Sequence, residues 1–278
     1  MSDQLKRAGR FSLPAWQAVI IDVAQALRFY SRLPVPVLPW EGDPHGLPDF
    51  SRIVRVLPLA GLVLGLFPAL VLVAALSLGL GPWLAAILSV ATATITTGAF
   101  HEDGLADTAD SFGAATRERR LAIMKDSLIG SFGASALILG FALRITALAT
   151  VLDRIELAAA VSAVLITAAL SRVAGLVPLM FLPPARTDGA AQAVGRPARE
   201  SFWFAAALMG SLALVLGLGA GLPPSGLAWM MVLAALSGIG LMRLAQRHIQ
   251  GQTGDIAGAA QQVAEIAALI GLLIALQP

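Results

Sequence analysis

Four carboxylates lie within nine residues of the segment HEDGLADTADSFG, namely Glu102, Asp103, Asp107 and Asp110. In an α-helix, at about 100° per residue, the three aspartates fall at positions i, i+4 and i+7 on one face. Like charges on one face repel one another, and a divalent cation would remove that conflict. Hard oxygen ligands favour Mg²⁺ or Mn²⁺. The segment is therefore a candidate metal site, with Glu102 as a helper.

The alternative for these acids is a solvated loop, or a set of ion pairs with neighbouring arginines. Isolated acids on a loop usually have that role. Here the acids directly follow AAILSVATATITTGAF, a run of 16 residues without a charge. Three acids on one helix face at the end of such a run favour the metal site.

A basic segment, RERRLAIMKDSLIGSFG, follows the acids and suits the binding of a polyphosphate. Lys125 offers a point charge, Ser127 a hydroxyl and the glycines open backbone N–H groups, all of which bind phosphate oxygens. Asp126 lies between them. Arg117 would share the acidic face if the helix continued past Gly113. Anchoring at a membrane boundary is the preferred role of the remaining arginines.

A second group of polar residues, in GQTGDIAGAAQQVAE, opens the last apolar segment. Thr253 is expected to cap a helix, and Asp255 suits its first turn because the helix dipole favours an acid there. Glu265 lies about 15 Å farther along, where an intramembrane acid is a functional-site candidate. Arg144 and Arg172 are the cations that could neutralise Glu265 or reach a substrate phosphate.

The elements that carry these residues are membrane helices. The chain of 278 residues is 57% hydrophobic and 13% charged, whereas soluble domains are roughly 25% charged. Apolar runs approach the ~20 residues that span a bilayer as helix, and the alternating strands of a β-barrel are missing from the sequence. The expected spans cover approximately 56–80, 82–100, 131–152, 157–182, 201–221, 227–245 and 257–276.

The fold class is therefore all-α, a polytopic membrane helical bundle of about seven transmembrane helices in a single domain over residues 1–278. Residues 1–55 form a cytoplasmic or interfacial N-terminal segment, and residues 56–278 form the bundle. Within the first segment, residues 14–31 are expected to form a helix that lies in the membrane interface. Packing of this helix against the bundle is an equally good interpretation.

Charge distribution predicts the orientation. Of the 19 Lys and Arg residues, 16 fall in residues 1–55, 101–130, 183–200 and 243–248, which lie on one side of the proposed topology. Basic loops stay in the cytoplasm, so the acidic segment is expected on the cytoplasmic side. The absence of cysteine excludes thiolate catalysis and Cys-ligated metals.

The motifs resemble those of the cobalamin synthase family, the adenosylcobinamide-GDP ribazoletransferases. The resemblance extends over nearly the whole chain, and Gln262 departs from it by standing where an acid is expected. The matching pieces are FYSRLPVP (29–36), GAFHEDGLADTADSFGA (98–114), RLAIMKDSLIGSFG (120–133) and GQTGDIAGAAQQVAE (251–265).

The resemblance implies a Mg²⁺-dependent enzyme of the bacterial inner membrane that acts late in cobalamin biosynthesis. It would join adenosylcobinamide-GDP to α-ribazole or α-ribazole 5′-phosphate and release GMP. The general base would be an acid of the cluster or His101. The lipid bilayer is the other expected partner, no nucleic acid is expected, and a homo-oligomer is compatible with the sequence. Residues expected to contact substrate are Arg117, Lys125, Asp126, Ser127, Arg172, Thr253, Asp255 and Glu265.

Three other classes fit less well. A CDP-alcohol phosphotransferase of the membrane would carry an Ala-Arg pair three residues after Asp-Gly, and here Asp103-Gly104 is followed by LADTAD. A membrane prenyltransferase would need a second Asp-rich motif. An ion-coupled transporter would distribute acids through the middle of its spans and often contain a repeat.

Overall fold

A computed structural model describes residues 14–44, 46–126, 128–186 and 195–277. These residues form helices joined by turns, with one isolated β-bridge between Pro184 and Gln252. The helices are α2 (Ala15–Tyr30), α3 (Phe50–Ile53), η1 (Val54–Val56), α4 (Leu57–Ser77), α5 (Gly81–Thr97), α6 (Phe100–Phe112), α7 (Arg117–Ile123), α8 (Ser131–Arg154), α9 (Leu157–Phe181), α11 (Arg199–Gly219), α12 (Pro224–His248) and α13 (Gly254–Ala275).

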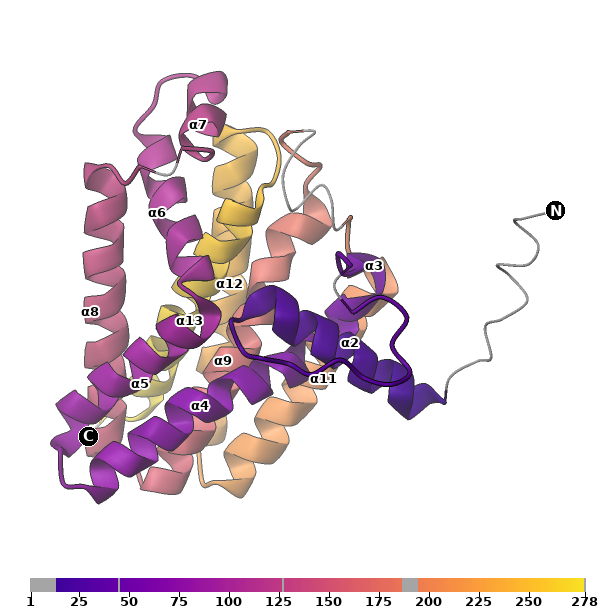
Figure 1. Cartoon of the computed structure of the whole chain (residues 1–278). Helices are drawn as coiled ribbons and strands as arrows, with labels where there is room; N and C mark the ends of the chain where they lie inside the picture. Colours follow the sequence, from indigo (N-terminus) through magenta and orange to yellow (C-terminus); the bar gives the residue numbers. More distant parts are fainter. Residues whose placement is uncertain (1–13, 45, 127, 187–194, 278) are drawn as a thin grey trace.

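The polytopic all-α fold is confirmed. In the described part of the chain, six segments are long and apolar enough to cross a membrane, and the pair α5 and α6 makes a seventh if it is counted as one span. The last five of these segments coincide with expected spans to within a few residues, whereas the first starts at Phe50 and the α5–α6 pair extends to Phe112, beyond the expected 82–100. In Figure 1, α6 rises from the end of α5 towards α7, while the α4–α5 turn lies at the opposite end of the bundle.

The second span differs from a straight helix because α5 and α6 meet at a bend of 89°. Gly98 and Ala99 both adopt left-handed backbone conformations, with φ of 65° and 58°. Glycine tolerates this conformation and commonly ends helices. The Arg32 N–H donates to Thr96 O at 2.8 Å, which fixes the end of α5 to the segment after α2. The bend directs the acidic helix away from the axis of α5.

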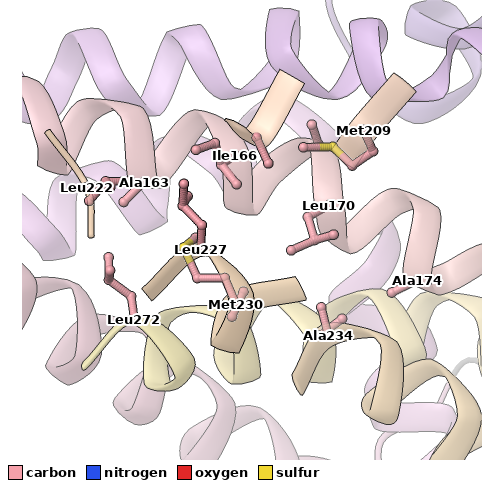
Figure 2. Packing of buried hydrophobic residues seen from close by; sticks show 14 of the residues in the cluster. Ala163, Ile166, Leu170, Ala174, Met209, Leu222, Leu227, Met230, Ala234 and Leu272 are labelled. Atoms are coloured by element: carbon pink, nitrogen blue, oxygen red, sulfur yellow. The ribbon is translucent and has the colours of Figure 1, made fainter. Parts of the chain in front are cut away.

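The core surrounds α9, whose most apolar window is 89% buried. Figure 2 shows Ile166 and Leu170 of α9 facing Met209 of α11, Met230 of α12 and Leu272 of α13. Small residues allow some of these helices to approach closely. A Cβ on Gly271 would lie 2.6 Å from Trp229 O, so α12 and α13 touch backbone to backbone. In a membrane the hydrophobic effect does not drive helices together, and close packing of this kind stabilises their association instead.

The N-terminal helix α2 packs against the bundle through its second half. Its first half exposes Trp16 and Ile20, whereas Leu27 in its second half is buried. Asp22, which the apolar stripe did not include, is fully buried and pairs with Arg52 and Arg55 at 2.7 Å each. This ion-pair cluster joins α2 to the segment that leads into α4. The location of α2 in the membrane interface stays a prediction.

Cysteine labelling tests the predicted orientation. The chain contains no natural cysteine, so Ala115→Cys and Ser225→Cys each introduce one exposed thiol, at the α6–α7 turn and at the start of α12. We expect a membrane-impermeant maleimide to label Ser225→Cys in intact cells and Ala115→Cys only in inverted vesicles, because basic loops stay in the cytoplasm. Labelling of both sites from the same side would contradict the topology.

Candidate active site

The acidic helix and the last helix touch at two glycines. A Cβ on Gly104 of α6 would lie 2.8 Å from Asp255 O and 3.2 Å from Gly258 Cα of α13. A Cβ on Gly258 would lie 3.4 Å from His101 Cα. Because only glycine permits this approach, the HEDG and TGDIAG segments form a single site, although about 150 residues separate them.

Asp103, Asp107 and Asp255 form the open part of this site. Asp103 is exposed, and the other two are half-buried. Asp107 is repelled by the charges of Asp103, Asp255 and Asp110, and is attracted by Arg186. Asp255 Oδ2 is buried and accepts no hydrogen bond from the described residues, and the nearest cation is Arg186 at 3.7 Å. The site therefore holds an excess of carboxylate charge and one unused buried oxygen.

Arg186 reaches the site because two loops pair with each other. The N–H of Ala185 donates to Gln252 O at 2.9 Å, and the N–H of Gln252 donates to Pro183 O at 2.8 Å. Gly251 packs closely against the loop after α9, since a Cβ on Gly251 would lie 2.7 Å from Ala185 Cα. We did not select Arg186 from the sequence, because only this pairing brings the loop after α9 next to Asp255.

The expected position of Arg117 was wrong. Helix α6 ends at Phe112, and Arg117 begins α7 instead of extending the acidic face. Its guanidinium donates to Ile249 O at 2.8 Å and to Ala185 O at 2.6 Å. Arg117 therefore holds the loop after α9 against the end of α12, and supports the loop that carries Arg186.

Asp110 differs from the other two aspartates of α6 because it contacts the start of α8. Asp110 accepts hydrogen bonds from the N–H groups of Gly130 at 2.7 Å and Gly133 at 2.8 Å. These groups belong to the start of α8, where unpaired N–H groups need acceptors. Among the described residues, no three His, Asp or Glu side chains are grouped so that they alone could hold a metal ion. Asp110 is engaged with α8, and metal binding by Asp103, Asp107, Asp110 and Glu102 stays a prediction.

Replacing Asp110 should therefore reduce stability. Asp110→Ala removes the acceptor for two backbone N–H groups of α8, and losing such a cap costs about 1–2 kcal/mol. Thermal unfolding in detergent measures the effect. Asp126→Ala is the matched control, because Asp126 is exposed and its carboxylate accepts the Leu128 N–H at 3.2 Å, a bond within one turn that fixes no helix end. Equal melting temperatures for the two variants would contradict the capping role.

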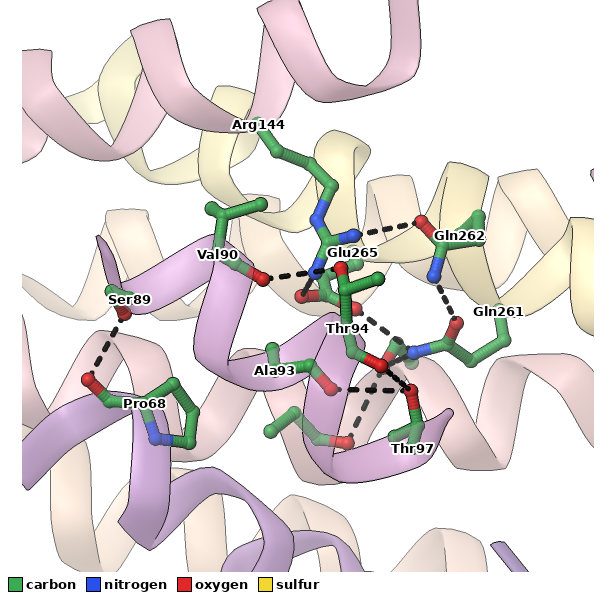
Figure 3. Close-up of polar contacts among 12 residues, drawn as sticks. Pro68, Ser89, Val90, Ala93, Thr94, Thr97, Arg144, Gln261, Gln262 and Glu265 are labelled. Carbon is green, nitrogen blue, oxygen red and sulfur yellow. Dashed lines mark hydrogen bonds and ion pairs between the residues drawn. The ribbon is translucent and has the colours of Figure 1, made fainter. Parts of the chain in front are cut away.

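Glu102 also has a partner other than a metal. It is buried, accepts from Thr94 Oγ1 at 3.0 Å and pairs with Arg144 at 3.0 Å. Arg144 in turn pairs with Glu265 at 2.8 Å, as one of the two sequence alternatives for Arg144 predicted. Figure 3 shows Arg144 reaching Gln262 and Glu265, and Gln261 linking to both of those side chains. This Arg144 network joins the α5–α6 bend to α8 and α13.

His101 and Arg172 lie beside this network. His101 is buried and stacks on Tyr30, with ring centroids 5.7 Å apart and planes at 4°. The guanidinium of Arg172 is buried, and its Nε has no hydrogen-bond partner among the described residues. His101 is therefore packed away from the exposed carboxylate of Asp103.

The remaining expected contacts occupy three positions. Thr253 caps α13 by accepting the Ile256 N–H at 3.3 Å, as predicted. Lys125 and Asp126 are exposed in the connection between α7 and α8. Ser127 lies outside the described residues. The phosphate-binding role of this connection stays a prediction.

The fold and the site together define a polytopic, all-α membrane protein with a carboxylate-rich site between two of its helices. The family model for cobalamin-5-phosphate synthase matches residues 22–273, and the chain belongs to that family. Similar proteins are adenosylcobinamide-GDP ribazoletransferases from Azorhizobium caulinodans, with 48% identity over 94% of this chain and 98% of the relative, and from Xanthobacter autotrophicus, with 47% identity over 91% and 96%. A third, from Rhizobium etli, is 42% identical over 92% and 97%. No solved structure matches the chain.

Proposed function

We propose that this protein joins adenosylcobinamide-GDP to α-ribazole, or to α-ribazole 5′-phosphate, and releases GMP. The observation that best supports this proposal is the contact between α6 and α13, which gathers Asp103, Asp107 and Asp255 into one acidic site. A donor with a diphosphate suits such a site if a divalent cation bridges the two. The names of the relatives supply the donor and the acceptor.

The donor set fits Mg²⁺. Asp103, Asp107 and Asp255 supply hard carboxylate oxygens, and Asp255 Oδ2 has no hydrogen-bond partner among the described residues. Mg²⁺ is commonly bound by one or two carboxylates together with substrate phosphates, so a complete protein cage is not required. When bound, the ion would neutralise charge on the diphosphate.

The protein residues position the acceptor and handle its proton. The 3′-hydroxyl of the ribazole ribose attacks the phosphorus on the cobinamide side, and the bond from that phosphorus to the GMP oxygen breaks in line. The hydroxyl proton passes to a carboxylate of the site. Asp103 suits this role because it is exposed, whereas His101 is buried against Tyr30. Arg186 and Lys125 contribute positive charge near the departing GMP.

We also propose that the protein resides in the bacterial inner membrane with this site on the cytoplasmic side. The distribution of 16 of the 19 basic residues supports the orientation. Water-soluble nucleotide substrates would then meet the site without crossing the membrane.

Turnover by purified protein tests the proposed function. Protein in detergent or nanodiscs is mixed with adenosylcobinamide-GDP and α-ribazole, and GMP and the cobalamin product are quantified with Mg²⁺ and with excess chelator. We expect product and GMP in equal amounts, and loss of both on chelation. A CDP-alcohol donor in place of adenosylcobinamide-GDP is the comparison, and exclusive turnover of that donor would overturn the proposal.

A further inference from the structure

Arg172 is an arginine buried within the helix bundle. It lies on α9, its side chain is more than nine-tenths buried, and among the described residues no carboxylate lies within ion-pair distance. Glu102 and Glu265 each pair directly with Arg144. They attract Arg172 only from a greater distance. A buried guanidinium with an unpaired Nε carries a desolvation cost that a ligand anion would offset.

Two small cavities meet at Arg172. Each has a volume of about 50 Å³, and both are lined by His101, Arg172 and Gln261. This volume accommodates a small anion or a few water molecules, and is much too small for a whole nucleoside. The site is therefore sized for a single anionic group at the end of a larger molecule.

The second cavity extends from Arg172 along α13 as far as Gly254. Its wall includes Gln261, Gly258, Ala257 and Gly254 of α13, and Gly254 precedes Asp255. The seven positions from Gly254 to Gln261 correspond to a helix rise on the order of 10 Å. A molecule with one end near Asp255 can thus reach Arg172 with an anionic group on the order of 10 Å away.

The rest of the wall favours a phosphate. Phe29, Phe50 and Phe100 give this cavity an apolar wall, and apolar surroundings strengthen electrostatic attraction to the guanidinium. Tyr30 lines the same cavity, and burial raises the pKa of its hydroxyl. The hydroxyl consequently stays protonated and is available to donate a hydrogen bond.

We propose that Arg172, in the cavity shared with Tyr30 and Gln261, binds the 5′-phosphate of the acceptor nucleotide and so allows the enzyme to use α-ribazole 5′-phosphate. This inference rests on the proposed function. The donor diphosphate is assigned to the acidic site, so the phosphate that the reaction leaves untouched is the one on the acceptor ribose. The name of the family and the names of the relatives differ in whether they include this phosphate. The family is named for a cobalamin 5-phosphate product, whereas the relatives are named for the transfer of ribazole.

Steady-state kinetics of the two acceptors test the assignment. Wild type, Arg172→Lys and Arg172→Gln are each assayed with saturating adenosylcobinamide-GDP and varied α-ribazole or α-ribazole 5′-phosphate. We expect Arg172→Gln to raise KM for the phosphorylated acceptor about 10- to 100-fold, which is the effect of losing hydrogen bonds to a charged group. KM for α-ribazole should change less than about threefold, and Arg172→Lys should be intermediate.

The two acceptors serve as controls for each other. A variant that only perturbs the fold, or that only disturbs the charge balance with Glu102 and Glu265, lowers turnover of both acceptors equally and overturns the proposal. Unchanged KM for both acceptors also overturns it.

If Arg172→Gln does not fold, Arg172→Lys and inhibition of α-ribazole turnover by inorganic phosphate decide. The inhibition should be competitive in wild type and weaker in Arg172→Lys, and equal inhibition rejects the phosphate site. If wild type turns over neither acceptor, the proposed function itself fails.

Discussion

Asp103→Asn and Asp107→Asn are each expected to lower turnover by about 10²- to 10³-fold while the protein remains folded. The reason is that both carboxylates are proposed to hold the cation that neutralises the diphosphate, and losing a group on which transition-state charge stabilisation depends typically costs this much. Turnover is measured by GMP release at saturating substrates over a range of Mg²⁺ concentrations. Raising the Mg²⁺ concentration should restore part of the loss if the carboxylates hold the ion.

Stability separates this role from a structural one. Asp107 is repelled by the charges of Asp103, Asp110 and Asp255, so neutralising it should leave the melting temperature of the substrate-free protein unchanged or slightly higher. Asp153→Asn is the matched control, because Asp153 is an exposed acid at the far end of α8. It should retain full activity. Inactive Asn variants with a clearly lowered melting temperature would show that the aspartates are structural.

Arg144→Met is expected to destabilise the fold more than any other single change considered. The substitution leaves Glu102 and Glu265 buried without their cation, and breaking a buried ion pair by removing one partner costs about 3–5 kcal/mol. Unfolding in detergent, followed by circular dichroism, gives the free energy change. Arg154→Met is the control, since Arg154 lies at the exposed end of the same helix and only donates to Leu276 O at 3.3 Å.

A combined variant distinguishes lost charge balance from lost packing. Adding Glu102→Gln and Glu265→Gln to Arg144→Met removes all three charges, and should recover most of the stability because apolar or neutral replacements of buried ion networks are often well tolerated. Recovery of stability without recovery of turnover would assign the Arg144 network to positioning the α5–α6 bend. A triple variant as unstable as Arg144→Met would contradict the electrostatic explanation.

The regular parts of this fold could be predicted because they depend on local patterns. The length of each apolar run defined a span, and the spacing of Asp103 and Asp107 predicted the helix that the structure contains as α6. The pairing of Glu265 with Arg144 was one of two alternatives, since an acid inside a membrane needs a cation. These inferences use only helix geometry and the cost of burying charge.

Contacts between distant segments could not be predicted in the same way. The engagement of Asp110 with α8 depends on the left-handed conformations of Gly98 and Ala99, which direct α6 across the bundle. Arg186 reaches Asp255 only because two loops pair. Both depend on tertiary geometry, and a polar side chain near a helix end has several equally good partners when only its sequence position is known.

The bend after α5 also has a consequence for the surrounding lipid. Helix α5 has 17 residues and is about 25 Å long, which is shorter than the ~30 Å hydrocarbon core of a typical bilayer. Helices α9 and α12, with 25 residues each, are about 37 Å long and must tilt. Local thinning of the bilayer would relieve the hydrophobic mismatch at α5 and would bring headgroups and water to the level of the bend. A large, polar corrinoid can therefore approach this side of the protein without being taken out of water, and short-chain lipids should suit the enzyme better than long-chain ones.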